Sequence, residues 1–316
     1  MTKAKKEQEI IPPVDRSLLK AELSRDKFFR NTNKAGNEIY VVTAHDSPNT
    51  LREIGRLREV SFRQAGGGTG KDHDLDVLDS AEVPYNQLIV WDPQAEEIVG
   101  GYRFMRCWEV GTDDSGTPHI ATAELFHFSD LFLREYLPYT IELGRSFVQP
   151  AYQPSRDNRK SIYSLDNLWD GLGGLVVEHP QLKYFVGKVT MFSHFDPFAR
   201  DLILYFMHRF FPDNQGLIHP RAPLKINHPD SELEAVFTGD NFEENYRLLS
   251  QKVRERGEFI PPLFNSYMGL SPTMKTFGTA YNEGFGGVEE TGIMVTIGDI
   301  YQSKKKRHVT SYKGSR

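Results

Sequence analysis

Two periods of apolar residues run through the chain, and together they predict a protein of mixed strands and helices. β-Branched and aromatic runs are typical of strands, whereas apolar residues three and four positions apart are typical of helices. The strand pattern is found around Glu142 and at residues 39–43, 87–91, 98–105, 184–191 and 292–297. The helical pattern is found at residues 50–64, 125–136, 165–178, 197–211, 241–256 and 261–270.

These elements predict a single main domain. The turn at Asp92-Pro93 joins two strands into a hairpin, and neither an internal repeat nor an interdomain linker interrupts the series. The expected fold is therefore α+β, or mixed α/β, with a central mixed sheet flanked by helices. We expect a partly helical N-terminal extension over residues 1–36 and a disordered basic tail over residues 303–316. The domain between them, residues 37–302, is expected to include a helical extension from about residue 214.

Composition limits the functional class. The net charge of −5 and the isoelectric point of about 6.1 disfavour nucleic-acid binding, which usually needs a basic domain. A single cysteine, Cys107, excludes an internal disulfide framework and is typical of a reducing cytoplasm. The chain lacks both an apolar run of about 20 residues and a signal-peptide pattern, so we expect a soluble cytoplasmic protein.

Two loops after the first long helix have compositions that suggest ligand binding. The glycine-rich run at 66–71 departs from a P-loop, because Ala65 stands at the first glycine and Asp72 at the Ser/Thr, so a flexible loop or lid is expected. The acidic loop that holds Asp76 and Asp79 would suit a hard cation, an ammonium group or plain solvent. No EF-hand, zinc or nucleophile-elbow spacing is present, and no metal is expected.

Charged residues in apolar strands give the strongest functional signal. Glu142 and Arg145 lie in a strand that is otherwise apolar, and Arg103 lies in another strand just after Gly100 and Gly101. A charge in such a strand is costly unless it is paired or used. Paired glycines, in turn, allow a ligand or a second backbone to approach closely. A structural ion pair between strands and a catalytic site therefore both remain open.

Taken in order, several motifs resemble those of one enzyme family. Its signatures are matched by the Glu-Leu-Gly-Arg run from Glu142, the Val-Gly-Gly-Tyr-Arg run that ends at Arg103, the acidic loop at 73–79 and the Leu-Arg-Glu-Val-Ser-Phe run at 57–62. Similar pieces extend from about residue 39 to residue 301. The family is the ornithine-lipid type of amino-acid N-acyltransferase, sometimes called hemolysin-like. It is related to the acyl-homoserine-lactone synthases and has the fold of the GCN5-related N-acetyltransferases (GNAT).

The resemblance implies a substrate pair and partners. A (3-hydroxy)fatty acyl group would move from the phosphopantetheine thioester of acyl carrier protein to the α-amine of ornithine or glycine, as the first step of aminolipid synthesis. No cofactor is expected to stay bound. The coenzyme A pyrophosphate loop of the acetyltransferases is missing after residue 152, which favours the carrier protein, although an acyl-CoA donor stays open. A separate O-acyltransferase would complete the lipid.

The resemblance also implies roles for individual residues. Attack by an amine on a thioester requires a base, and Glu142 is the expected one, directly or through water. Arg145 and Arg103 belong to the same catalytic group, and Arg103 is expected to grip the acceptor carboxylate. The expected acceptor site contains Asp76 and Asp79, with Arg58 and Phe62 beside them. The backbone amides near Phe147 and Val148 are candidate oxyanion donors.

Two helices and one basic segment complete the expected site. The apolar helices from residues 165 and 197 would line an acyl tunnel, although their pattern fits an ordinary core equally well. The cations Arg156, Arg159 and Lys160 would face the acidic carrier protein, where complementary charge speeds encounter. A solvated basic loop explains these three residues as well.

Two rival functions remain. An acyl-homoserine-lactone synthase would use S-adenosylmethionine, but those synthases are shorter than a chain with a long part after about residue 214. A non-catalytic acyl- or lipid-binding protein would place the basic cluster at 304–307 against anionic lipid, as a peripheral contact with the inner membrane face. The mass of the product would distinguish a lactone synthase from an amino-acid N-acyltransferase. Acyl or lipid binding without consumption of the thioester would favour the non-catalytic protein.

Overall fold

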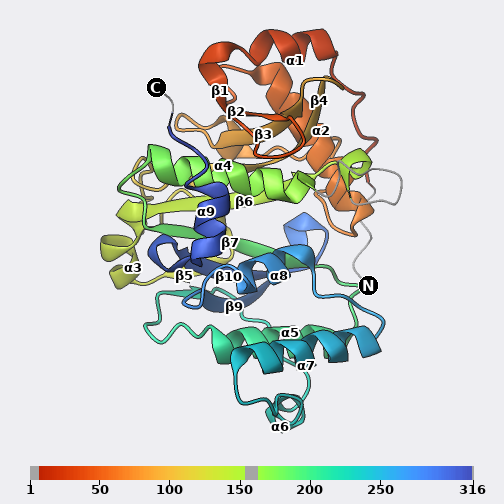
Figure 1. Ribbon diagram of the computed structural model, residues 1–316, viewed down its shortest axis with the longest axis vertical. Helices are drawn as coiled ribbons and strands as arrows, with labels where there is room; N and C mark the ends of the chain where they lie inside the picture. The colour runs from red at the N-terminus through yellow and green to blue at the C-terminus, as the bar shows by residue number, and fades with distance from the viewer. Residues whose placement is uncertain (1–6, 154–162, 315–316) are drawn as a thin grey trace.

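An eight-stranded sheet forms the centre of the computed structural model, which describes residues 7–153 and 163–314 (Figure 1). The strand order is β1-β2-β3-β4-β6-β7-β10-β9, and every neighbouring pair is antiparallel except β6 and β7. The strands are β1 (Phe28–Asn31), β2 (Glu38–Val42), β3 (Asn86–Asp92), β4 (Glu97–Arg106), β6 (Thr140–Val148), β7 (Tyr184–Met191), β9 (Lys275–Asn282) and β10 (Val288–Thr296). A small second sheet pairs β5 (Phe126–Phe128) with β8 (Ile218–Pro220).

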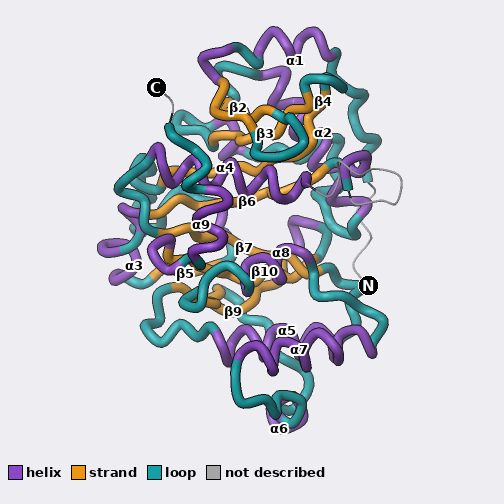
Figure 2. Tube along the Cα trace, in the orientation of Figure 1, coloured by secondary structure: helices purple, strands orange, loops and turns teal. Residues whose placement is uncertain are grey.

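Helices cover both faces of the central sheet, and Figure 2 shows the strands passing between them. The described helices are α1 (Arg16–Glu22), α2 (Pro48–Gln64), α3 (Asp130–Glu135), α4 (Ser164–Glu178), α5 (Pro197–Phe210), α6 (Asp230–Glu234), α7 (Phe242–Glu255), α8 (Pro262–Met268) and α9 (Gln302–His308). Leu88 and Val90 of β3 belong to the same core cluster as the α4 leucines, whereas Ile89 and Trp91 pack with the α2 side chains. Because successive strand residues face opposite sides, α2 and α4 cover opposite faces.

The expected α+β fold is confirmed, with most elements where the apolar pattern predicts them. Strands β2, β3, β4, β6, β7 and β10 and helices α2, α4, α5, α7 and α8 all fall within a few residues of their expected ranges. The segment 125–136, expected as one helix, divides into β5 and α3. Strand β9 was not predicted, because Gly278 interrupts its apolar pattern.

The described parts of both terminal segments are more ordered than expected. The extension at 1–36 supplies β1, which pairs with β2 at the edge of the sheet. The tail expected to be disordered forms α9, whose Arg307 and His308 pair with Asp166 and Asp170 of α4 at 2.7 and 2.8 Å. Arg30 of β1 donates to the backbone carbonyls of Asp170 and His308. These contacts are tertiary, so the charged tail sequence alone gave no sign of them.

Two local features shape the middle of the sheet. Strand β6 has a bulge, because Arg103 pairs with Gly144 while Gly101 pairs with Phe147. Arg145, inside the bulge, has a φ of 52°, a left-handed conformation that is uncommon for a residue with a side chain. Parallel pairing of β6 with β7 ends just before this point, so the two strands separate there.

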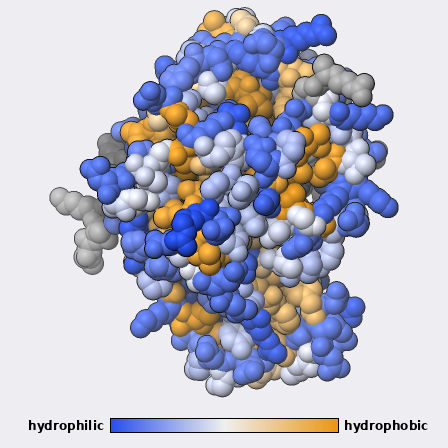
Figure 3. All heavy atoms as spheres, turned by 90° about the vertical axis from the view of Figure 1, so that its left-hand side faces the viewer, coloured by the Kyte–Doolittle hydropathy of each residue, from blue (hydrophilic) through white to orange (hydrophobic). Residues whose placement is uncertain are grey.

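Among the described residues, no helix combines the length and apolar character needed to cross a bilayer. The face of the molecule in Figure 3 is largely hydrophilic, with hydrophobic side chains in separate groups.

Candidate active site

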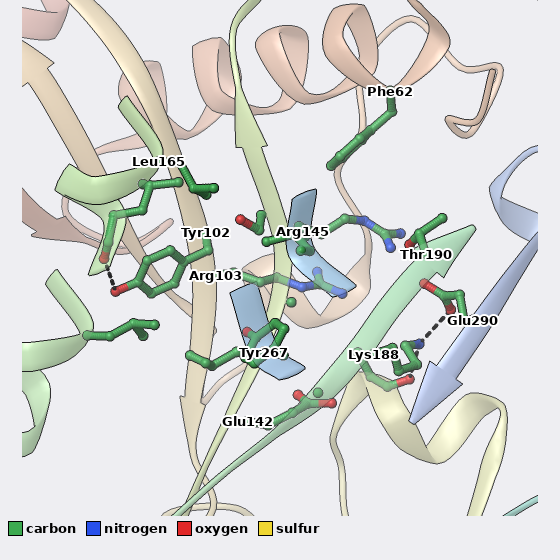
Figure 4. A pocket seen from close by; sticks show the side chains of 18 of the residues that line it. Phe62, Tyr102, Arg103, Glu142, Arg145, Leu165, Lys188, Thr190, Tyr267 and Glu290 are labelled. Atoms are coloured by element: carbon green, nitrogen blue, oxygen red, sulfur yellow. Dashed lines mark hydrogen bonds and ion pairs between the residues drawn. The ribbon is translucent and has the colours of Figure 1, made fainter. Parts of the chain in front are cut away.

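A cavity opens where β6 and β7 separate (Figure 4). The last parallel partners are Leu143 and Gly187. Beyond them the two strands line the cavity with Gly144, Arg145, Ser146, Lys188 and Thr190. Helices α2, α4 and α8, strands β4 and β10, and the residues Ala121 and Phe285 also contribute to the wall. The cavity therefore results from the divergence of two strands, with side chains from both strands facing it.

Glu142 lies in this wall and is held by hydrogen bonds on both carboxylate oxygens. One oxygen accepts from the Thr122 backbone N–H at 2.6 Å and from the Thr122 hydroxyl at 2.5 Å. The other accepts from the Tyr85 hydroxyl, which itself accepts from the Ala121 N–H at 2.8 Å. The side chain is buried. Thr122 and Ala121 belong to a short 3₁₀ turn, Ala121–Glu124, so this turn fixes the orientation of Glu142.

A second acid, Glu290 of β10, lines the same cavity and is paired with Lys188 of β7. Their nitrogen and oxygen lie 3.1 Å apart, and Asn282 donates to the same Glu290 oxygen at 2.9 Å. Lys188 also donates to the Ala121 carbonyl at 3.2 Å. Burial tends to raise the pKa of Glu290, but Lys188, Asn282 and Arg145 outweigh it and hold the pKa below its ordinary value. Glu290 is therefore a carboxylate at neutral pH.

The opposite part of the cavity is apolar. It is lined from α4 and α8 by Leu165, Leu168, Trp169, Leu172, Leu263 and Tyr267. Trp169 meets Tyr267 edge to face, with ring centroids 5.5 Å apart. The expected contribution of α4 to an acyl-binding wall thus agrees with its position, whereas none of the lining residues comes from α5, which packs in the core.

Arg103 reaches the cavity but is paired with two carboxylates, the partly exposed Asp76 and the buried Asp79. One guanidinium nitrogen lies 2.8 Å from Asp76 and 3.0 Å from Asp79, and the group stacks on the Tyr85 ring at 4.6 Å. Burial would lower the pKa of Arg103, yet the two aspartates raise it above its ordinary value. Arg58 lies 3.5 Å from Asp79 on the other side. Asp79 is thus shared by two buried cations.

This arrangement changes the expected role of the acidic loop. Burial raises the pKa of Asp79, but Arg103 and Arg58 lower it to about 2. Asp76 caps the 3₁₀ turn at Val77–Ser80 and receives Arg103. Arg58, Asp76 and Asp79, expected to bind the acceptor, are not among the residues that line the cavity. Their contacts instead anchor Arg103 and the acidic loop to the sheet.

Arg145 is oriented by an acid and an aromatic ring. Its Nε lies 2.9 Å from Asp74, and its guanidinium lies 4.2 Å from the centre of the Phe285 ring. Phe285 meets Phe62 edge to face at 5.0 Å, and both rings line the cavity. Phe62 and Arg145 are therefore brought together with Glu142, as the sequence motifs implied.

The glycine-rich run is anchored, where a flexible loop or lid was expected. Buried Glu59 accepts from the backbone of Thr69 at 3.0 Å and of Gly70 at 2.8 Å. Gly286 lies against the run, because a β-carbon at Gly286 would come within 2.9 Å of the Gly67 backbone. The run thus packs beside the turn that carries Phe285.

Other expected residues lie elsewhere. Phe147 and Val148 pair with Gly101 and Gly100 in the β4–β6 ladder and do not line the cavity. Arg156, Arg159 and Lys160 fall outside the described residues.

Sequence reasoning also missed four polar residues of the site: Tyr85, Thr122, Lys188 and Glu290. Lys188 had the same signal as Glu142, a charge within an apolar strand. Glu290 was not identified because the strand was expected to begin at residue 292, two residues after it.

Comparisons with known proteins identify a domain and close relatives of this chain. The family model of the acetyltransferase (GNAT) domain matches residues 57–159. A glycine N(alpha)-acyltransferase of Phocaeicola vulgatus is 54% identical over 305 residues, covering 96% of this chain and 94% of that protein. A protein of the same name from Bacteroides thetaiotaomicron is 52% identical over 305 residues, covering 96% of this chain and 90% of that protein. A solved CoA-dependent acyl-homoserine lactone synthase, BjaI, is similar with a TM-score of 0.39 and 13% identity, over 89% of this chain and 95% of that chain, which is too distant to support an argument.

Proposed function

This chain belongs to the family of the glycine Nα-acyltransferases, and on that basis we propose that it transfers a long-chain acyl group from a thioester to the α-amine of glycine. The expected GNAT fold and the expected N-acyltransferase class are confirmed. The observation that carries the proposal is the division of one cavity. Its polar part holds Glu142, Lys188 and Glu290, and its apolar part lies between α4 and α8.

The polar part suits a free amino acid. Glycine at neutral pH carries an ammonium and a carboxylate, so its site needs charges of both signs. Glu142 and Glu290 supply negative charge, while Lys188 and Arg145 supply positive charge. Glycine is proposed ahead of ornithine because both curated relatives are named for glycine.

The apolar part suits a long acyl chain, because burying each methylene group contributes about 0.8 kcal/mol. The donor is proposed to be the phosphopantetheine thioester of acyl carrier protein, with acyl-CoA as the alternative. The segment after β6, Gln149-Pro150-Ala151-Tyr152, supports this choice, because it forms a 3₁₀ turn and lacks the glycines of a pyrophosphate-binding loop. Arg156, Arg159 and Lys160 come a few residues later in the sequence and are proposed to contact the carrier.

The reaction consumes an ammonium and a thioester. The ammonium loses one proton to a base, and the nitrogen lone pair then forms a bond to the thioester carbon. Collapse of the tetrahedral intermediate breaks the carbon–sulfur bond, and the second nitrogen proton neutralises the departing thiolate. The base is a carboxylate of the cavity, either Glu142, as the sequence suggested, or Glu290.

The product is an amphiphile, so the proposal extends to the membrane and to a second enzyme. Lys304 and Lys306 are exposed on helix α9. Each basic residue near an anionic membrane surface contributes about 1 kcal/mol to the free energy of membrane binding. The proposed location is the cytoplasm with peripheral contact, and a separate O-acyltransferase would act on the N-acyl product. Sedimentation with anionic liposomes should be weaker for Lys304→Glu/Lys306→Glu than for the unchanged chain.

A single incubation tests the acceptor and the donor together. Purified protein is mixed with 3-hydroxyhexadecanoyl carrier protein, or with the matching acyl-CoA, and an equimolar mixture of amino acids. Mass spectrometry should detect N-acylglycine as the main product. Acylation of ornithine instead would overturn the proposed acceptor, and folded protein that leaves both thioesters intact would overturn the proposed function.

A further inference from the structure

The two acids that line the cavity differ in what occupies their oxygens. Glu142 accepts three hydrogen bonds, two from Thr122 on one oxygen and one from Tyr85 on the other. Each carboxylate oxygen has two lone pairs, so three of the four acceptor positions are filled by the protein itself. A carboxylate held in this way is well oriented, but most of its capacity to accept a substrate proton is already used.

Glu290 is held on one side only. Asn282 and Lys188 both approach the same oxygen, at 2.9 and 3.1 Å. Within the described residues, no hydrogen bond reaches the other oxygen, although the side chain is 4% exposed and lines the cavity. The strand register explains this placement, because Glu290 lies opposite Thr190 and both residues face the separated strands. Figure 4 shows Glu290 and Lys188 side by side, joined by their ion pair, with Glu142 below them in the same view.

We propose that Glu290 is the catalytic base, which binds the α-ammonium of the acceptor through its open oxygen and removes the proton. Glu142 then acts as a positioning residue, which holds Tyr85 and the turn at Ala121–Glu124 against the cavity. This inference rests on the proposed amino-acid acceptor. It places the catalytic base on β10, whereas the sequence motifs suggested Glu142 on β6.

The proton balance is complete with these groups. The ammonium gives one proton to the Glu290 carboxylate, and the neutral amine attacks the thioester carbon. The second proton leaves the nitrogen with the departing thiol, and Glu290 returns its proton to solvent. The nitrogen of the neighbouring Lys188 contacts Glu290 and the Ala121 carbonyl, and in this proposal it also binds the acceptor carboxylate.

The charges around Glu290 favour its ionised carboxylate form. Lys188 faces it from β7, Arg145 acts on it from β6, and Asn282 donates from β9. These groups keep the carboxylate ionised across the neutral range, so the pH dependence of the reaction is set by the acceptor amine. An ionised base can accept the ammonium form directly, and kcat/KM for glycine should then be nearly flat between pH 7 and pH 9.

The decisive experiment compares pH profiles of kcat/KM for glycine in the unchanged chain and in Glu290→Gln. Loss of a general base typically costs about 10²–10⁴-fold at neutral pH. The variant depends on the small fraction of glycine that is already neutral, so its kcat/KM should rise about tenfold per pH unit. Glu289→Gln is the matched control, because Glu289 is the adjacent acid on β10 but faces Arg200 on the opposite side, at 2.7 Å.

The outcomes separate this inference from the proposed function. A Glu290→Gln profile parallel to that of the unchanged chain would overturn Glu290 as the base, even though glycine is acylated. An unchanged chain that forms no acylglycine would overturn the function itself. If Glu290→Gln does not fold, Glu290→Asp keeps the charge beside Lys188 and withdraws the carboxylate by one methylene. It should lower kcat/KM while keeping the flat profile, and full activity in that variant would also overturn the assignment.

Discussion

A β-carbon placed on Gly187 would stand 2.6 Å from the carbonyl oxygen of Leu143, so these two residues bring β6 and β7 as close as their backbones allow. They are also the last parallel partners before the strands separate. The narrow end of the cavity is therefore defined by a contact that only glycine permits.

Replacing this glycine should lower the stability of the folded protein. Gly187→Ala forces the strands apart and is expected to lower the free energy of unfolding by about 1–3 kcal/mol, the usual range for overpacking. Urea denaturation measures the change. Gly298→Ala is the control, because a β-carbon at Gly298 meets nothing within 4 Å. Equal stability of the two variants would contradict the close contact.

Glu142→Gln should act through positioning. The amide can still accept from Thr122, but its NH₂ group faces Tyr85, whose hydroxyl proton loses its acceptor. A buried donor left without a partner costs about 1–3 kcal/mol. We expect lower thermal stability and lower turnover, with a pH profile that keeps the shape of the unchanged chain. A slope of tenfold per pH unit in this variant would instead identify Glu142 as the base.

Asp79→Asn should be strongly destabilising at neutral pH. It leaves Arg58 and Arg103 buried without their shared carboxylate, and breaking a buried ion pair typically costs about 3–5 kcal/mol. Asp114→Asn, in an exposed loop, should change stability by no more than about 0.5 kcal/mol. Chemical denaturation of the two variants at pH 7 provides the comparison.

The same carboxylate predicts a pH dependence. The folded pKa of Asp79 is about 2, below the ordinary value of 3.8. A depressed folded pKa contributes stability above the unfolded pKa, and this contribution is lost as pH falls from about 3.8 toward 2. The stability difference between the unchanged chain and Asp79→Asn should therefore narrow in that acidic range. A difference that stays constant would show that Asp79 is not ionised in the folded protein.

Trp169 should limit the length of the acyl chain. Its side chain lines the reaction cavity and also two further cavities beside α9, so it lies between them. Trp169→Ala should raise the ratio of kcat/KM for longer over shorter acyl donors. A donor series measured against Phe259→Ala, which removes an aromatic side chain that is 73% exposed, tests this prediction. An unchanged ratio would place the end of the chain elsewhere.

Much of the fold was predictable because its signals are local. The alternation in β3 and the helical spacing in α2 follow from residues that are neighbours in sequence. Glu142 was recognisable for the same reason, as a charge in an apolar strand. The edge strand β1 and helix α9 were not, because they are stabilised by residues more than a hundred positions away, such as Asp170.

The candidate site was less predictable because it depends on register. The motif residues Arg58, Asp76 and Asp79 looked like ligand-binding groups, and only the packed structure places them around Arg103. The pairing of Lys188 with Glu290 depends on β10 lying beside β7, a relationship between strands about a hundred residues apart. A pattern of neighbouring residues does not reveal which strands, so far apart in the sequence, will pair in the sheet.

The contact between Arg30 and the backbone of His308 joins positions 278 residues apart. A ribosome delivers the chain from its N-terminus, so β1 emerges long before α9 is made. This contact can form only after residue 308 has been synthesised and has left the ribosome. Strand β1 therefore lacks this contact while every other strand of the central sheet is being synthesised.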